Sequence, residues 1–221
     1  MASAAAEYWS RLFGFRYRRH RYGVLFYSLL LSLVADPVFA ALGWPAVLLE
    51  WLLAANLVAA VAPLEPGPGR RLVFATIAVL FLARFVTNWV PVSIPLVLAL
   101  ALWALAGLVA AGAALRFALR AVTVTSEHLY AALSAYLLAG LFFGLTYWVV
   151  EQVVPGTFPV AGEFTRTSAQ YFSFVTLATL GYGDIVPRGE IGRGLAVIEG
   201  IGGQLFLAVM VARLVSVYAK K

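Results

Sequence analysis

Six long apolar segments constrain this 221-residue chain more than any other feature. Each is close to the roughly 20 residues that a helix needs to cross the hydrocarbon of a bilayer, and Pro- or Gly-rich connections separate several of them. Their approximate ranges are 22–42, 45–62, 72–90, 95–115, 129–150 and 192–217. The sequence therefore predicts an all-α membrane protein with six transmembrane helices.

Composition agrees with a bilayer as the solvent. The chain is 63% hydrophobic and 12% charged, against about 25% charged residues in an average soluble domain. It has no cysteine and only two histidines, His20 and His128, which excludes disulfides and thiolate chemistry. We expect membrane lipids as partners, no nucleic acid in spite of the net charge of +6, no cofactor, and no enzymatic activity.

The distribution of positive charge predicts the orientation. With the N-terminus inside, the connections on that side hold most of the basic residues, whereas the outer connections hold only Arg166 and Arg188. We therefore expect both termini in the cytoplasm and the protein in the plasma or inner membrane. The basic segment 1–21 is either an amphipathic segment that lies on the inner leaflet or a flexible tail. We expect no signal-peptide cleavage near Ala40, and no ligand-binding module after the last helix.

Three ionisable residues fall within the first three apolar segments: Asp36, Glu50 and Arg84. Charged groups in lipid are costly and usually pair inside a bundle, so we predict an ion pair between Arg84 and one of the acids. It either fixes helix packing or acts as a membrane-embedded sensor. The fourth segment has no charge from Leu96 to Leu115, so we expect weak voltage dependence.

These patterns suggest three parts: the basic segment 1–21, a four-helix membrane domain 22–120, and a pore domain 121–221. A hydroxyl cap followed by Glu127 predicts the start of the fifth helix. The connection 151–190 is too long for a simple turn. Within it, Thr167 and Gln170 suggest a capping box that opens a short apolar helix from Ser168 to about Ala178. We predict a re-entrant pore helix, because irregular backbone at membrane depth must be buried in protein or line water.

The stretch that follows this helix, 179–184, carries the candidate chemistry. Gly181 and Gly183 lack a Cβ and can adopt positive φ cheaply, so successive carbonyls can point the same way and replace the water around a potassium ion. Rings of backbone carbonyls are the known basis of potassium selectivity. The Thr179 hydroxyl adds an oxygen at the inner mouth, and Asp184 adds negative charge at the outer mouth. We expect Tyr182 to point away from the ion path and to pack against pore-helix aromatics.

The run from Tyr171 to Asp184 resembles the pore signature of tetrameric potassium channels, and most closely the bacterial "ion channel 2" pore-domain group. The resemblance covers about residues 125–218. It implies an outer helix, pore helix, filter and inner helix in each of four subunits. The ion ligands that it implies are Thr179, Leu180, Gly181, Tyr182 and Gly183, and the residues that support the filter are Tyr171, Phe172 and Thr176. Ala178 departs from the usual second threonine, and Leu180 from the usual valine or isoleucine.

The last segment contains three glycines and an acid near its middle. By resemblance, Gly203 lies where inner helices have a gating hinge, with Gly200 and Gly202 as weaker candidates. The alternative is close helix packing, which small residues permit in membranes. We expect Glu199 to accept a hydrogen bond behind the pore helix, for example from Ser173 or Thr176, and not to bind the ion.

The predicted function is passive conduction of potassium through a homotetramer, with K⁺ bound at Thr179, Leu180, Gly181 and Tyr182. One alternative is a non-selective cation channel. A subunit of a coupled potassium transporter is less favoured, because transporters of the pore-loop kind carry four loops in one chain and this chain carries one. A third alternative is a membrane sensor with a vestigial filter.

Overall fold

The computed structural model describes residues 21–35, 37–39, 41–44, 93–121 and 124–218, together with isolated positions between 52 and 79. The predicted second and third segments, 45–62 and 72–90, fall largely outside these residues. The proposed ion pair of Asp36, Glu50 and Arg84 lies outside them as well.

The described part of the chain is helical, and four of its helices are long and apolar enough to cross a membrane. The first is the stretch Arg21–Phe39. The others are α4 (Ser93–Arg120), α5 (Ser126–Val153) and α7 (Glu190–Tyr218), and a short helix, α6 (Arg166–Leu177), precedes α7. The three long labelled helices each extend beyond the predicted apolar segments, since charged and polar residues continue them at their ends.

The start of α5 follows the predicted pattern. Thr125 is the N-cap, its backbone N–H donates to Nδ1 of His128 at 3.2 Å, and Glu127 lies in the first turn. This side-chain acceptor satisfies one backbone donor at the helix start, and the acid suits the positive end of the helix dipole.

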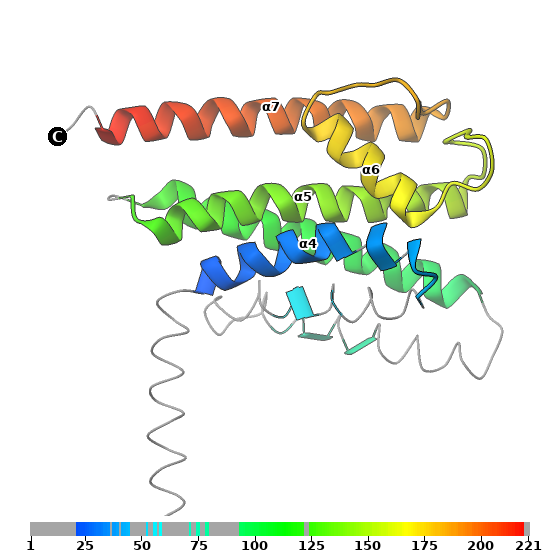
Figure 1. Cartoon of the computed structure of the whole chain (residues 1–221), viewed down its shortest axis with the longest axis horizontal. Helices are drawn as coiled ribbons and strands as arrows, with labels where there is room; N and C mark the ends of the chain where they lie inside the picture. Colours follow the sequence, from blue (N-terminus) through cyan, green and yellow to red (C-terminus); the bar gives the residue numbers. More distant parts are fainter. Residues whose placement is uncertain are drawn as a thin grey trace, which may run out of the picture.

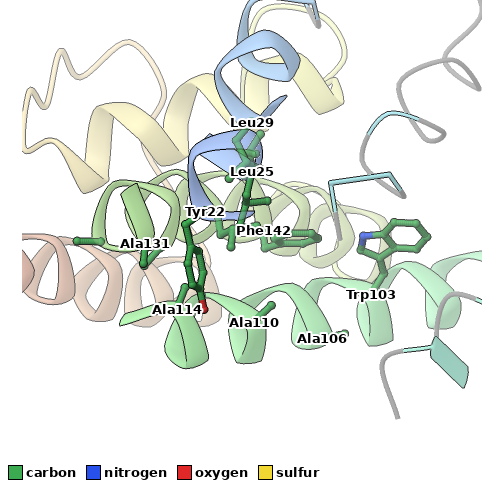
Figure 2. Close-up of a cluster of buried hydrophobic side chains, with 14 of the residues drawn as sticks. Tyr22, Leu25, Leu29, Trp103, Ala106, Ala110, Ala114, Ala131 and Phe142 are labelled. Atoms are coloured by element: carbon green, nitrogen blue, oxygen red, sulfur yellow. The ribbon is translucent and has the colours of Figure 1, made fainter. Parts of the chain in front are cut away.

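A core of small and large apolar side chains joins α4, α5 and the Arg21–Phe39 helix (Figure 2). Along α4, Ala106, Ala110 and Ala114 recur at every fourth position and are buried, which lets helix backbones approach closely. Gly107 shows how close the approach is, since a Cβ there would lie 2.1 Å from the ring of Phe142 on α5. These contacts make α4 and α5 one packed unit.

Helix α6 has 12 residues, about 18 Å at 1.5 Å per residue, so it is too short to cross the roughly 30 Å of hydrocarbon. It lies obliquely between α5 and α7 (Figure 1). Two glycines of α5 leave room for α6 to pack closely against α5. A Cβ on Gly140 would lie 2.5 Å from the Phe174 ring, and one on Gly144 would lie 2.8 Å from Cα of Gln170.

The cap of α6 differs from the predicted one. Thr165, not Thr167, is the N-cap, and its hydroxyl oxygen accepts from the backbone N–H of Ser168 at 3.1 Å. The predicted capping box of Thr167 and Gln170 is therefore wrong. Both threonines have a polar residue three positions later, and the pattern alone placed the start one half-turn too late.

After α6 the chain returns to the end of the bundle where α5 finished (Figure 1). The backbone N–H of Arg188 donates to the carbonyl of Thr157 at 2.8 Å. The carboxylate of Glu151 at the end of α5 accepts from the N–H groups of Gly156 at 2.7 Å and Phe158 at 2.8 Å. These bonds hold the α5–α6 loop and the returning stretch together.

Candidate functional site

The stretch 179–184 has an alternating backbone. Thr179, Gly181 and Gly183 have positive φ angles of 56°, 57° and 80°. The φ angles of Leu180 and Tyr182, which lie between them, are not positive. Positive φ at Gly181 and Gly183 was predicted from their lack of a Cβ. Thr179 is the only non-glycine residue with positive φ in the described part of the chain, and for a β-branched side chain this conformation is an outlier.

Carbonyl groups at the end of α6 hold the start of this stretch. The N–H of Thr179 donates to the carbonyl of Thr176 at 3.0 Å, and the N–H of Leu180 donates to that of Val175 at 2.9 Å. Thr176, expected to support the filter, thus contacts it through its backbone oxygen. The alternating stretch therefore begins at the carbonyl end of α6, where the helix dipole is negative.

The side chains of the stretch are not covered by the rest of the described chain. Leu180 is 57% exposed and Tyr182 is 67% exposed, and every residue from Ala178 to Asp184 is exposed. Non-helical backbone at membrane depth has to line water or be buried in protein, so at the predicted re-entrant position this surface would need either a partner or an aqueous path.

The two aromatic residues expected behind the stretch occupy different places. Tyr171 stacks on Tyr182 with ring centroids 6.5 Å apart. Phe172 is instead buried against Tyr147, with centroids 4.9 Å apart. Tyr182 thus contacts Tyr171, whereas Phe172 packs against Tyr147 on α5.

A buried carboxyl group joins three helices behind the stretch. Glu199 of α7 is 1% exposed; it accepts from the hydroxyl of Tyr147 on α5 at 2.6 Å and from that of Ser173 on α6 at 2.5 Å. Of the two expected partners of Glu199, Ser173 is confirmed. The Ser173 hydroxyl also lies 2.7 Å from the carbonyl of Gly140, and its single hydrogen serves one acceptor at a time. Tyr147 was not anticipated, since nothing in the sequence pairs it with Glu199.

The glycines of α7 differ in their surroundings. A Cβ on Gly203 would lie 2.3 Å from the carbonyl oxygen of Leu177, whereas one on Gly200 would lie 3.9 Å from that of Thr176 and one on Gly202 would meet nothing within 4 Å. Gly203 is thus a point of backbone contact between α7 and the end of α6. This geometry supports the packing alternative, and the hinge stays a prediction.

One contact to the stretch was missed by the sequence analysis. The side-chain amide of Gln204 donates to the Thr179 hydroxyl oxygen at 2.9 Å. Gln204 follows the close-contact glycine directly, but a lone glutamine in an apolar helix carries no pattern that would identify its partner. Among the described residues, no group of three or more His, Cys, Asp or Glu side chains could hold a metal ion.

Comparison with known proteins places this site in context. Residues 131–220, which include α6, the stretch 179–184 and nearly all of α5 and α7, match the family model described as "Ion channel". An inward rectifier potassium channel, Kirbac3.1 of Paramagnetospirillum magnetotacticum, is 37% identical over 78 residues. That match covers 34% of this chain and 24% of the relative, so the chain spans about a quarter of the relative's length. No solved structure matches the chain. The matches support an ion channel embedded in a membrane.

Proposed function

We propose that this protein is a potassium-selective channel that conducts passively, with 179–184 as its selectivity filter. The single observation that carries the proposal is the run of positive φ at alternate residues, Thr179, Gly181 and Gly183. Alternating handedness turns successive carbonyls toward one side, which is the arrangement that replaces the hydration shell of K⁺. The similarity of part of the chain to a potassium channel supports the choice of ion.

The proposed active unit is a homotetramer. One filter offers carbonyls from one direction only, so an ion needs several copies around an axis. The burial of α7 supports this assembly. Only 11% of an apolar 18-residue stretch within its span Glu190–Arg213 is buried within the chain, against 50% for the corresponding stretches of α4 and α5. The exposed filter and the exposed face of α7 would then meet the partners and the ion path.

In this proposal the ion contacts backbone oxygens of Thr179, Leu180, Gly181 and Tyr182, and the Thr179 hydroxyl contributes at the inner mouth. Asp184 lies at the outer mouth, and both termini lie in the cytoplasm. Helix α6 serves as a re-entrant pore helix whose negative carbonyl end favours a cation.

Potassium flux from liposomes that contain the purified protein tests the proposal. We expect K⁺ efflux down its gradient without an energy source, and block by barium, a divalent cation of similar radius. Flux that needs ATP or a second coupled ion would favour a transporter instead. Equal Na⁺ and K⁺ flux would favour a non-selective cation channel, and no flux under any condition would favour a sensor.

A further inference from the structure

The left-handed conformation of Thr179 is held by contacts to both its backbone and its side chain. Non-glycine residues in the left-handed region cost about 1–3 kcal/mol and persist only where the surroundings hold them. The α6 carbonyls fix the backbone N–H groups of Thr179 and Leu180. The side chain of Thr179 has one described hydrogen-bond partner, the Gln204 amide on α7.

Gln204 is itself held at a fixed distance from the filter. Gly203 brings the α7 backbone against the carbonyl of Leu177. One turn earlier, Glu199 binds Ser173 on α6. These two contacts set the spacing and rotation of α7 against α6, and so bring the exposed Gln204 side chain within hydrogen-bond distance of Thr179.

We propose that Gln204 is a positioning residue for ion selectivity, which holds the Thr179 hydroxyl and, through it, the left-handed backbone at the inner end of the filter. A hydroxyl oxygen has two lone pairs. The amide occupies one of them, and the other stays free to face a cation. Without the amide, the Thr179 hydroxyl loses its side-chain partner, and the strained backbone is restrained only by the α6 carbonyls, so the oxygens of Thr179 are less firmly aimed at the ion path.

This inference rests on the proposed function, and a substitution series separates the two. Gln204→Leu keeps the approximate size and removes the donor. Gln204→Asn keeps an amide but shortens the side chain by one methylene, so the amide no longer reaches Thr179. Gln152→Leu makes the same chemical change at an exposed glutamine near the end of α5 and serves as the matched control.

The measured quantity is the K⁺/Na⁺ permeability ratio of the full-length protein in bilayers. We expect Gln204→Leu and Gln204→Asn to lower it about 3- to 10-fold, the range that one neutral hydrogen bond allows, with Gln152→Leu unchanged. In a Thr179→Val background, Gln204→Leu should change the ratio no further, because the acceptor is already gone.

For a variant that does not conduct, the difference in thermal unfolding temperature between K⁺ and Na⁺ gives a second readout, since a bound ion stabilises the folded state. We expect this difference to shrink in Gln204→Leu. The inference would be overturned if Gln204→Leu left the K⁺/Na⁺ permeability ratio, or the difference in unfolding temperature between K⁺ and Na⁺, unchanged. An additive effect of Gln204→Leu and Thr179→Val on the permeability ratio would also overturn it, as would a wild-type permeability ratio in Gln204→Asn. A wild-type protein that shows no K⁺ preference would instead overturn the proposed function.

Discussion

At the scale of single residues, the candidate site depends on backbone conformation more than on side-chain chemistry. Thr179, Gly181 and Gly183 share positive φ, yet only the glycines adopt it without steric cost. Strained conformations cluster at functional sites, so the threonine supports the hypothesis that this stretch is functional. The flanking contacts from Thr176 and Gln204 show how the strain is held.

Gly181→Ala tests this dependence. Alanine at φ near +57° costs about 1–2 kcal/mol, and the strained residue is expected to turn its carbonyl away from the ion path. We expect liposome K⁺ flux to fall at least tenfold while the fold is kept, since a Cβ there meets nothing within 4 Å in the subunit.

Gly43→Ala is the matched control, because Gly43 has φ of 66° and is equally free of neighbours, but lies in a turn far from α6 in the chain. Its flux should equal that of the wild type. Equal loss of flux in the two variants would mean that general strain, and not the filter, is responsible.

Glu199 gives a second prediction at this scale. Glu199→Leu removes the acceptor of the buried Tyr147 hydroxyl, and an unsatisfied buried donor costs about 1–3 kcal/mol. We expect Glu199→Leu to unfold more easily than Glu199→Gln, which keeps an acceptor, in denaturation of the detergent-solubilised protein. Adding Tyr147→Phe should recover part of the loss; a further loss in the double variant would show that the hydrogen bond is not the cause.

At the scale of elements, helix existence could be predicted from apolar length, but helix contacts could not. The stretches around 95–115, 129–150 and 192–217 were each identified, and their helices are longer by polar turns at the ends. The cap of α6 was misplaced because Thr165 and Thr167 offer similar local patterns, and tertiary packing decides between them. The partners Tyr147 and Gln204 lie on other helices, which no local pattern specifies.

The packing role of Gly203 is tested at this scale. Gly203→Ala would place a Cβ against the Leu177 carbonyl, and such overpacking costs about 1–3 kcal/mol. Gly200→Ala lies on the same face with ordinary contact distance and should gain up to ~1 kcal/mol from helix propensity. Thermal unfolding of the two variants measures the difference; a Gly203→Ala protein as stable as Gly200→Ala, with altered open probability, would favour a hinge.

At the scale of the whole molecule, the exposed stretch 179–184 and the sparsely buried α7 span favour the proposed assembly. In the proposed channel, one chain of 23.8 kDa would offer filter carbonyls to the ion from one side only. The helical fold class and the positive φ of Gly181 and Gly183 could be predicted from sequence, because apolar length and glycine spacing are local features; six transmembrane helices and the role of 179–184 stay predictions. The assembly and the role of the first four segments could not, since they depend on surfaces that meet between helices or subunits.

The proposed tetramer can be tested by its mass. Native mass spectrometry of the protein in detergent should show a species of four subunits. A predominant monomer or dimer that still conducts K⁺ would contradict the tetramer.

The central claim is that 179–184 selects potassium, and the reversal potential of the purified protein in a planar bilayer with K⁺ on one side and Na⁺ on the other tests it most directly. Carbonyl ligands that replace the hydration shell of K⁺ predict a reversal potential strongly displaced from zero in the direction that K⁺ selectivity requires, and a Gly181→Ala protein should lose this displacement or its current. A wild-type current that reverses near zero would contradict the claim.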